Sequence, residues 1–251
     1  MIHDIYTIYL REMLRLRRQR VRLVTTIVMP LLWLGIIGNA FNNAFKTVGS
    51  SLLGGDFLSF LTPGILIMTM VFTATISGIT TVFDREFGFL KEMLVAPIKR
   101  ESILIGKMFG GVSQAILQGI IIIVLAIFMG VSFSGASSIP GMLLTMFLVS
   151  IAFVSLGLAV ASKIKSMEGF QMIMNFLIQP MIFLSGAFYP VKTLPSWLKI
   201  FVRINPLTYG VDAMRYFAIG INEFNVILDL TILAIFSILL ILLGGHFFRK
   251  T

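Results

Sequence analysis

The sequence predicts an all-α membrane protein with six transmembrane helices, and three observations carry this prediction. Charged residues are 12% of the 251 residues, against roughly 25% in soluble domains. Hydrophobic residues reach 57%, and the mean hydropathy is +0.98. The apolar residues form continuous runs, which favours helices over the alternating strands of a membrane barrel. Since so few charges could not cover a soluble domain of this size, the chain is predicted to lie in a bilayer.

Residues 1–22 predict an amphipathic helix on the cytoplasmic face of the membrane. Arginines at 11, 15, 18 and 22 form one stripe at helical spacing, and a second, apolar stripe consists of Ile2, Ile5, Tyr6, Tyr9, Met13 and Leu16. Such a helix lies in the lipid interface, with its arginines near the phosphates. The alternative is that the basic residues act only as a topology signal. We divide the chain into this helix and a membrane domain over residues 23–251.

Charge-free stretches define the membrane spans, because a spanning helix needs about 20 mainly apolar residues. Five such stretches contain 23, 27, 55, 23 and 19 residues. The longest is sufficient for two helices, and Ile139-Pro140-Gly141 supplies a break near its middle. The six predicted spans therefore cover about residues 23–41, 57–82, 105–130, 140–162, 169–189 and 228–247.

The lysines and arginines predict the orientation. With a cytoplasmic N-terminus, 15 of these 20 residues lie in cytoplasmic segments and 5 lie outside. This asymmetry indicates that both termini face the cytoplasm of a multi-pass protein in the cell inner membrane. It also accounts for the net charge of +9, so nucleic acid is not a predicted partner.

The cytoplasmic loop after the second span is unusually apolar. Residues 85–95 fit a short helix that ends before Pro97. Its apolar side chains require something to bury them: Phe87, Phe89, Leu90, Met93 and Leu94. They either lie on the membrane and the protein's own helices, or fit a hydrophobic groove on a cytoplasmic partner.

Two short helices are predicted outside the membrane, between the fifth and sixth spans. Pro195 can open the first, in which Trp197, Ile200, Phe201 and Ile204 form one stripe. Asn205-Pro206 ends it, and residues 207–216 are helical again. These helices suit the outer headgroup level or a re-entrant hairpin. Asp212 and Arg215 predict a local surface ion pair of little energetic weight.

Polar side chains within the spans are amides rather than charges. Gln114 and Gln118 share a face of the third span, and Asn175 and Gln179 share a face of the fifth. They either join helices or line a substrate path. No Asp, Glu, Lys or Arg falls inside the apolar cores, which argues against ion-coupled carriers.

The sequence contains no recognisable catalytic or cofactor site. It has no phosphate-binding loop, no cysteine and no carboxylate cluster of the kind that metal-dependent headgroup transferases require. We therefore expect a protein that is not an enzyme and that binds no cofactor or metal itself.

Three segments in order along the chain resemble a known family. They are Leu61-Thr62-Pro63-Gly64, residues 84–97, and residues 184–190 followed by 204–215. Together they resemble permeases of the type-two ABC exporter family, closest to the daunorubicin-resistance and nodulation-factor type. The resemblance covers nearly the whole chain.

The resemblance implies a half-transporter that dimerises and pairs with two copies of a separate ATPase subunit, which binds ATP and Mg. It implies that the N-terminal helix is a connecting helix and that the cytoplasmic loop is a coupling helix seated on the ATPase. The implied coupling residues are Arg85, Glu86, Phe87, Phe89, Leu90, Glu92, Met93, Leu94 and Pro97. The implied extracellular cap over the exit path consists of Tyr189, Pro190, Trp197, Asn205, Pro206, Tyr209, Asp212 and Arg215.

The expected function is ATP-driven export of an amphipathic drug-like or lipid-linked compound. Export of a polysaccharide or glycolipid is the alternative within this class. A secondary carrier or channel that works without an ATPase is the alternative from another class, and a membrane scaffold without transport is a third.

Overall fold

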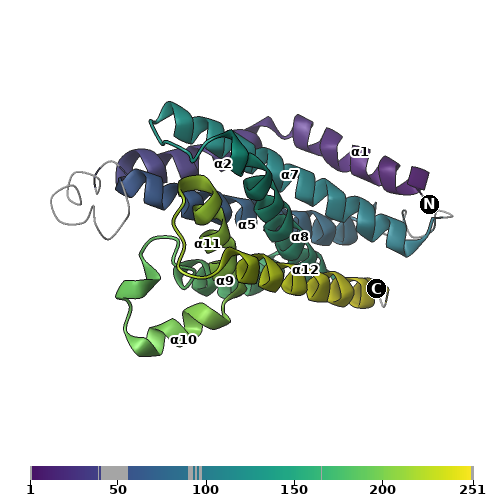
Figure 1. Cartoon of the computed structure of the whole chain (residues 1–251). Helices are drawn as coiled ribbons and strands as arrows, with labels where there is room; N and C mark the ends of the chain where they lie inside the picture. The colour runs from purple at the N-terminus through teal and green to yellow at the C-terminus, as the bar shows by residue number, and fades with distance from the viewer. Residues whose placement is uncertain are drawn as a thin grey trace.

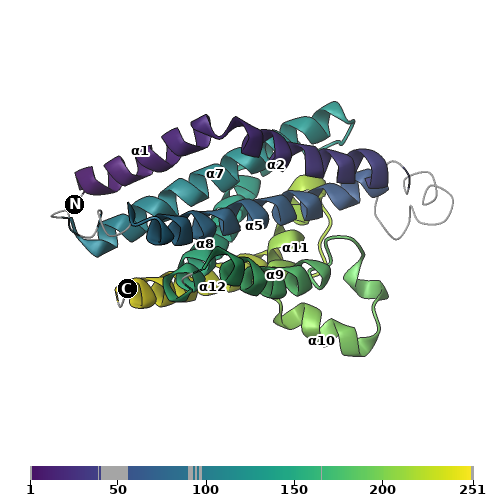
Figure 2. The same ribbon diagram turned by 180° about the vertical axis from the view of Figure 1, so that it is seen from behind.

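The computed structural model describes residues 2–38, 40, 56–89, 93, 95, 98–164 and 166–249. These residues form helices and no strand, as the sequence predicts. Figures 1 and 2 show the long helices side by side, with α1 beginning and α12 ending at the same end of the bundle. We call this the terminal end, and the opposite end, near α10, the cap end.

The helices follow one another along the chain. Their bounds are α1 Ile2–Arg18, α2 Arg20–Leu32 with the π-helical turn η1 Trp33–Gly38, α5 Phe57–Glu86, α7 Arg100–Phe128, η2 Ala136–Ser138, α8 Ile139–Lys163, α9 Met167–Phe183, η3 Val191–Thr193, α10 Ser196–Ile204, α11 Pro206–Ile219 and α12 Val226–Arg249.

Four helices of the described part are long and apolar enough to cross a membrane: α5, α7, α8 with η2, and α12. They match four of the six predicted spans. The predicted break is confirmed, because α7 ends at Phe128 and Pro140 lies in the first turn of α8. Proline is tolerated there because that turn has no intrahelical acceptor for its N–H. The shorter apolar helix Val24–Gly38 lies within the first predicted span, and α9 covers most of the fifth. Residues 39 and 41 of the first lie outside the described part.

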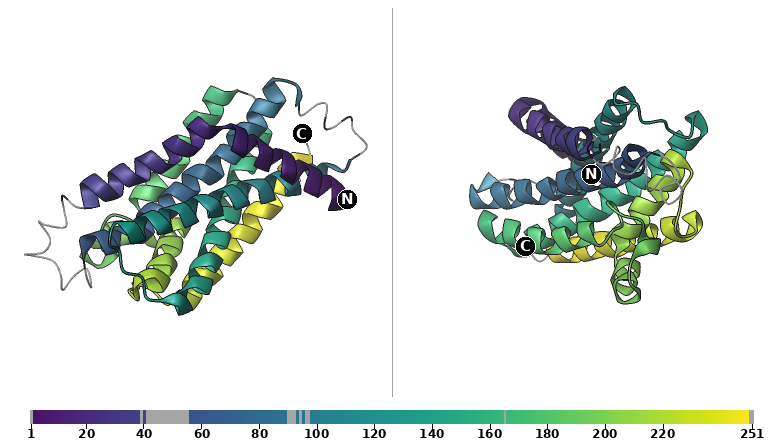
Figure 3. Two further views of the ribbon diagram at one scale, coloured as in Figure 1. Left: turned by 90° about the horizontal axis from the view of Figure 1, so that it is seen from above. Right: turned by 90° about the vertical axis from the view of Figure 1, so that its left-hand side faces the viewer.

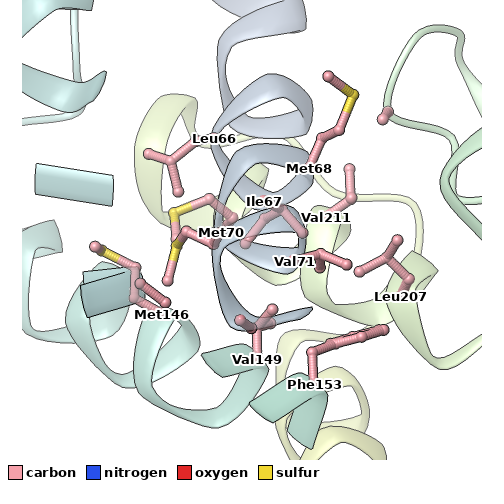
Figure 4. Close-up of a cluster of buried hydrophobic side chains, with 14 of the residues drawn as sticks. Leu66, Ile67, Met68, Met70, Val71, Met146, Val149, Phe153, Leu207 and Val211 are labelled. Carbon is pink, nitrogen blue, oxygen red and sulfur yellow. The ribbon is translucent and has the colours of Figure 1, made fainter. Parts of the chain in front are cut away.

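Helix α5 forms the centre of the core. Figure 4 shows its side chains Ile67, Met70 and Val71 among Met146, Val149 and Phe153 of α8 and Leu207 and Val211 of α11. Glycines bring the backbones together, since a Cβ atom on Gly78 of α5 would lie 2.7 Å from the carbonyl oxygen of Gly157 in α8. Small residues of this kind allow close helix packing in lipid.

Helix α1 packs closely against α7, also at glycine residues. A Cβ atom on Gly106 would lie 2.7 Å from Cβ of Ile8, and one on Gly110 would lie 2.7 Å from Cβ of Glu12. The left view of Figure 3 shows α1 turning away from the direction of α2, and the turn falls at the non-helical Gln19. The amphipathic N-terminal segment is therefore helical and packs over the terminal end of the bundle.

The two short helices near the cap end differ from each other. The predicted boundaries are confirmed, with Pro195 before α10 and Asn205 before α11. The stripe of Trp197, Ile200, Phe201 and Ile204 on α10 is exposed, and α10 projects from the bundle in Figure 1. By contrast, most of α11 is buried against α5, α8 and α12. The first alternative, a helix at the outer headgroup level, is therefore corrected for α11.

The loop after α5 begins later than the sequence predicts. Arg85 and Glu86 belong to the last turn of α5, and the chain turns at Gly88, whose φ of +83° suits glycine. Helical conformation resumes at Phe89 and is present at Met93 and Val95. The predicted coupling residues Leu90, Glu92, Leu94 and Pro97 lie outside the described residues.

Candidate functional site

Five charged side chains from three helices meet at the terminal end. We call Arg11, Glu12, Arg15, Asp84 and Lys107 the terminal cluster. Lys107 Nζ lies 2.5 Å from Asp84 Oδ2 and 3.6 Å from Glu12 Oε1. Arg11 Nη2 and Arg15 Nη1 each lie 3.2 Å from Asp84 Oδ1. The side chains of Asp84 and Lys107 are each 1% exposed.

The terminal cluster joins α1, α5 and α7. A buried charge is costly without a partner, so each cation here holds a carboxylate that another helix supplies. The sequence predicts no charge within the apolar cores, and the structure qualifies this expectation. Asp84 lies in the last turn of α5 and Lys107 is the eighth residue of α7, and both are buried rather than solvated.

The end of α5 is fixed on its other side by Arg85. Its guanidinium donates to the carbonyl oxygens of Ala161 at 3.1 Å, Ser162 at 3.1 Å and Ile164 at 3.2 Å. These carbonyls end α8, where an arginine satisfies acceptors that the helix leaves unpaired. Arg85 therefore joins α5 to α8. Its coupling role, which the resemblance implies, stays a prediction.

Phe87 and Phe89, which follow Arg85, extend outward from the end of α5. The ring of Phe87 lies 4.3 Å from that of Phe83, and the Arg15 guanidinium lies over the Phe83 ring at 5.3 Å. Phe87 is 59% exposed and Phe89 is 46% exposed. Glu86 beside them is also exposed.

Met93 behaves differently from the two phenylalanines. It packs against the buried side chains of Ile8 and Ile103. The expectation that this loop buries its apolar groups is thus met within the protein by Met93, whereas Phe87 and Phe89 are exposed.

A groove of about 340 Å³ lies between α2, η1, α5 and α9. Trp33, Phe72, Phe183 and Phe188 supply aromatic walls, and Thr69, Thr73 and Gln179 supply polar groups. A mainly apolar cavity with a few polar groups is typical of sites for amphipathic small molecules.

The four amides singled out in the sequence divide into two kinds. Gln118 Nε2 donates to the carbonyl oxygen of Thr26 in α2 at 2.8 Å, and Gln114 Nε2 lies 3.5 Å from that of Glu12 in α1. Both are buried and join helices. On α9, Gln179 lines the groove and Asn175 is exposed.

Several of the predicted cap residues bond to backbone groups at the start of α11 and in the segments before it. The Asn205 side chain accepts from the N–H of Leu207 at 3.1 Å and donates to the carbonyl oxygen of Met181 at 2.6 Å. Pro206 is the first residue of α11. The Tyr209 hydroxyl donates to the carbonyl oxygen of Arg203 at 2.6 Å.

The remaining members of the predicted cap lie before α11. Tyr189 donates its hydroxyl hydrogen to the carbonyl oxygen of Phe183. Pro190 precedes the turn η3, and Trp197 is exposed on α10.

Asp212 and Arg215 do not form the predicted surface ion pair, because both are buried and bond to the backbone. Asp212 accepts from the N–H groups of Glu223 at 2.9 Å and Phe224 at 2.8 Å. Arg215 Nη2 donates to the carbonyl oxygen of Gly186 at 2.9 Å, and its guanidinium lies 4.0 Å from the Phe60 ring centre. Burial lowers the pKa of Arg215 to about 10, so it is charged at neutral pH.

Comparison with known proteins identifies the family. Residues 3–219 match the ABC-2 type transporter family. The chain is 32% identical to the ycf38 protein of Porphyra purpurea, which carries a transport-permease name, over 86% of this chain and 74% of that protein.

Two bacterial permeases are more distant relatives. The inner membrane transport permease YadH of Escherichia coli K12 is 26% identical over 86% of this chain and 84% of its own length. The daunorubicin resistance ABC transporter permease protein DrrB1 of Streptomyces coeruleorubidus is 25% identical over 82% of this chain and 71% of its own. The family match covers most of the sequence, and the chain belongs to the ABC-2 type transporter family.

Proposed function

We propose that this chain is the transmembrane permease subunit of an ATP-driven exporter, and that ATP and Mg bind to a separate ATPase subunit. Membership of the ABC-2 transport permeases supports this assignment. The observation that carries it is the exposed pair Phe87 and Phe89, which directly follows the firmly bonded end of α5. An exposed aromatic pair on a rigid base suits an apolar groove on a partner.

In this proposal six helices cross the inner membrane and both termini face the cytoplasm. The first span comprises α2 with η1, and the fifth is α9, whose 17 residues extend roughly 26 Å. Two features support the arrangement: α1 begins where α12 ends (Figure 1), and α1 is rich in arginine. Residues 1–22 then form the interfacial connecting helix, residues 23–251 form the membrane domain, and α11 is a re-entrant element within it.

The proposed coupling passes from the ATPase through residues 85–97 into the bundle. Two ATPase copies bind a dimer of permeases. When the two ATPase copies close on each other, they displace residues 85–97. Because the terminal cluster and Arg85 tie α5 to α1, α7 and α8, the four helices respond together. A partner can shift such an equilibrium only by the difference between its contact energies in the two states, so the docking surface must be firm.

The proposed substrate is an amphipathic drug-like or lipid-linked compound. The groove beside α9 supports this, since its aromatic walls and few hydroxyl and amide groups suit an apolar body with a small polar part. The name of DrrB1 points to daunorubicin resistance in that relative. A polysaccharide, the alternative, would need more hydrogen-bonding groups than this groove offers.

The coupling role is tested by replacing Phe87 and Phe89 with Asp. We expect these variants, reconstituted with the ATPase, to lose at least about tenfold of ATP-dependent transport of a lipophilic dye while keeping the wild-type unfolding temperature. Exposed substitutions usually change stability by less than about 0.5 kcal/mol. Phe87→Tyr, which keeps the ring, is the matched control and should retain transport. Full ATP-dependent transport by the Asp variants would contradict the coupling role of this loop.

A further inference from the structure

A second groove lies between α7 and α12 at the terminal end of the bundle, and the proposed export function does not use it. Its volume is about 400 Å³. Each helix lines it with residues at positions i, i+1, i+4 and i+5, counted from Arg100 in α7 and from Ile241 in α12. Residues at this spacing share one face of a helix. We call this site the terminal groove.

The terminal groove is polar at the terminal end and apolar one helical turn further in. Arg100 and Glu101 lie in the first turn of α7, and His246 lies in the last turn of α12. One turn further along each helix the walls are aliphatic, as at Leu104 and Leu242. This gradient matches the boundary between the headgroups and the acyl chains of a bilayer.

The groove is open because α12 packs against α8 more closely than against α7. A Cβ atom on Gly244 would lie 3.4 Å from the carbonyl oxygen of Ser155 in α8. Gly245 lines the groove, and a Cβ atom there would lie 4.0 Å from Leu104 Cδ2 in α7, which is ordinary van der Waals contact. A larger side chain at Gly245 therefore has room to enter the groove.

The aliphatic wall of the groove continues along the outside of α12. Leu242 is 64% exposed, and Leu239 and Ile235 are also exposed at helical spacing from it. An exposed apolar stripe on a spanning helix faces the hydrocarbon of the bilayer. An acyl chain that leaves the groove can lie along this stripe, so the site suits a lipid better than a water-soluble ligand.

The charged groups of the groove suit a headgroup that carries both signs of charge. The guanidinium of Arg100 and an imidazole N–H of His246 are donors for phosphate oxygens. The carboxylate of Glu101 is an acceptor for an ammonium group. A headgroup with negative charge alone would lie beside Glu101 and be repelled by it.

We propose that the terminal groove binds one phospholipid of the phosphatidylethanolamine type. Its phosphate lies at Arg100 and His246, its ammonium at Glu101, and an acyl chain along α12. The bound lipid fills the space between α7 and α12 and stabilises their contact. The proposal goes beyond the export function, because it concerns a resident lipid and requires neither a transported compound nor an ATPase.

The first test compares lipids on the wild-type chain and needs no variant to fold. The full chain in detergent micelles receives equal amounts of phosphatidylethanolamine and phosphatidylcholine, and native mass spectrometry measures which lipid stays bound. Choline has no N–H to donate to Glu101, so we expect a preference for phosphatidylethanolamine of at least about threefold. Equal binding of the two lipids, or tighter binding of phosphatidylglycerol, would overturn the proposal.

The second test uses variants that keep the wild-type unfolding temperature. Glu101→Gln should lose the preference for phosphatidylethanolamine, and Arg100→Gln should bind both lipids less. Gly245→Leu should lose the preference because its side chain fills the groove. Lys99→Gln, which removes an exposed cation that does not line the groove, is the matched control and should keep the preference. An unchanged preference in Glu101→Gln or Gly245→Leu, or its loss in Lys99→Gln, would overturn the proposal.

Discussion

The two ends of the bundle bury charges by different means. In the terminal cluster, side chains pair with side chains: Lys107 and two arginines hold Asp84 across three helices. Near the cap end, the buried side chains of Asp212 and Arg215 bond to backbone groups instead. Asp212 accepts from N–H groups, and Arg215 donates to a carbonyl oxygen.

This difference indicates what each end does. Pairs between side chains tie whole helices together, and each depends on a partner that another helix supplies. Bonds to the backbone fix turns and ends of the chain locally. The terminal cluster therefore suits the transmission of movement among α1, α5 and α7, whereas the cap contacts hold the shape around α11. Substitutions should accordingly be coupled at the terminal end and independent at the cap end.

The largest effect on stability is expected for Lys107→Met. It leaves Glu12 buried without its cation and removes one of the three cations that hold Asp84, which should lower the free energy of unfolding by about 4 kcal/mol. Chemical unfolding in detergent micelles measures it. Adding Glu12→Gln should recover a large part of the loss, because it removes the carboxylate that Lys107→Met leaves without a cation. Strictly additive effects of the two substitutions would contradict the cross-helix pairing.

A smaller effect is expected for Arg215→Lys, which keeps the charge. The planar guanidinium both donates to Gly186 and covers the Phe60 ring, and lysine cannot do both. We expect a loss of about 2 kcal/mol by the same measurement. Combined with Lys107→Met, the losses should add. Unchanged stability of Arg215→Lys would show that charge alone is required there.

The smallest effects separate two glutamines. Gln118→Leu removes the bond from α7 to Thr26 of α2 and should cost about 1 kcal/mol. Gln179→Leu, in the wall of the groove, should leave stability unchanged but alter the affinity for a transported dye. If both substitutions lowered stability equally and neither changed dye binding, Gln118 and Gln179 would not have the different roles described above.

Much of the fold could be predicted because the bilayer imposes simple patterns. Charge-free runs locate α5, α7, α8 and α12, and prolines mark the starts of α8, α10 and α11. For α11, the sequence left a surface helix and a re-entrant element as alternatives and did not decide between them. The charged residues of α11 suggest a surface helix, and only the packing supplies backbone partners for Asp212 and Arg215.

The terminal cluster was missed for a related reason. Arg11, Asp84 and Lys107 are far apart in the sequence, and each looks like a charge at the border of an apolar run. A usable signal did exist in Gly106 and Gly110, whose four-residue spacing predicts a close helix neighbour. The spacing does not identify α1 as that neighbour. Because the sequence does not show which helix packs against which face, it also left the roles of Gln118 and Gln179 open.

Transport into proteoliposomes tests the central claim most directly. The chain is reconstituted alone or with an ABC ATPase subunit that co-purifies with it, and accumulation of a lipophilic dye against its gradient is followed with and without ATP. We expect uphill accumulation with both the ATPase and ATP present, and none from the chain alone. Uphill transport by the chain alone would contradict a permease that a separate ATPase drives.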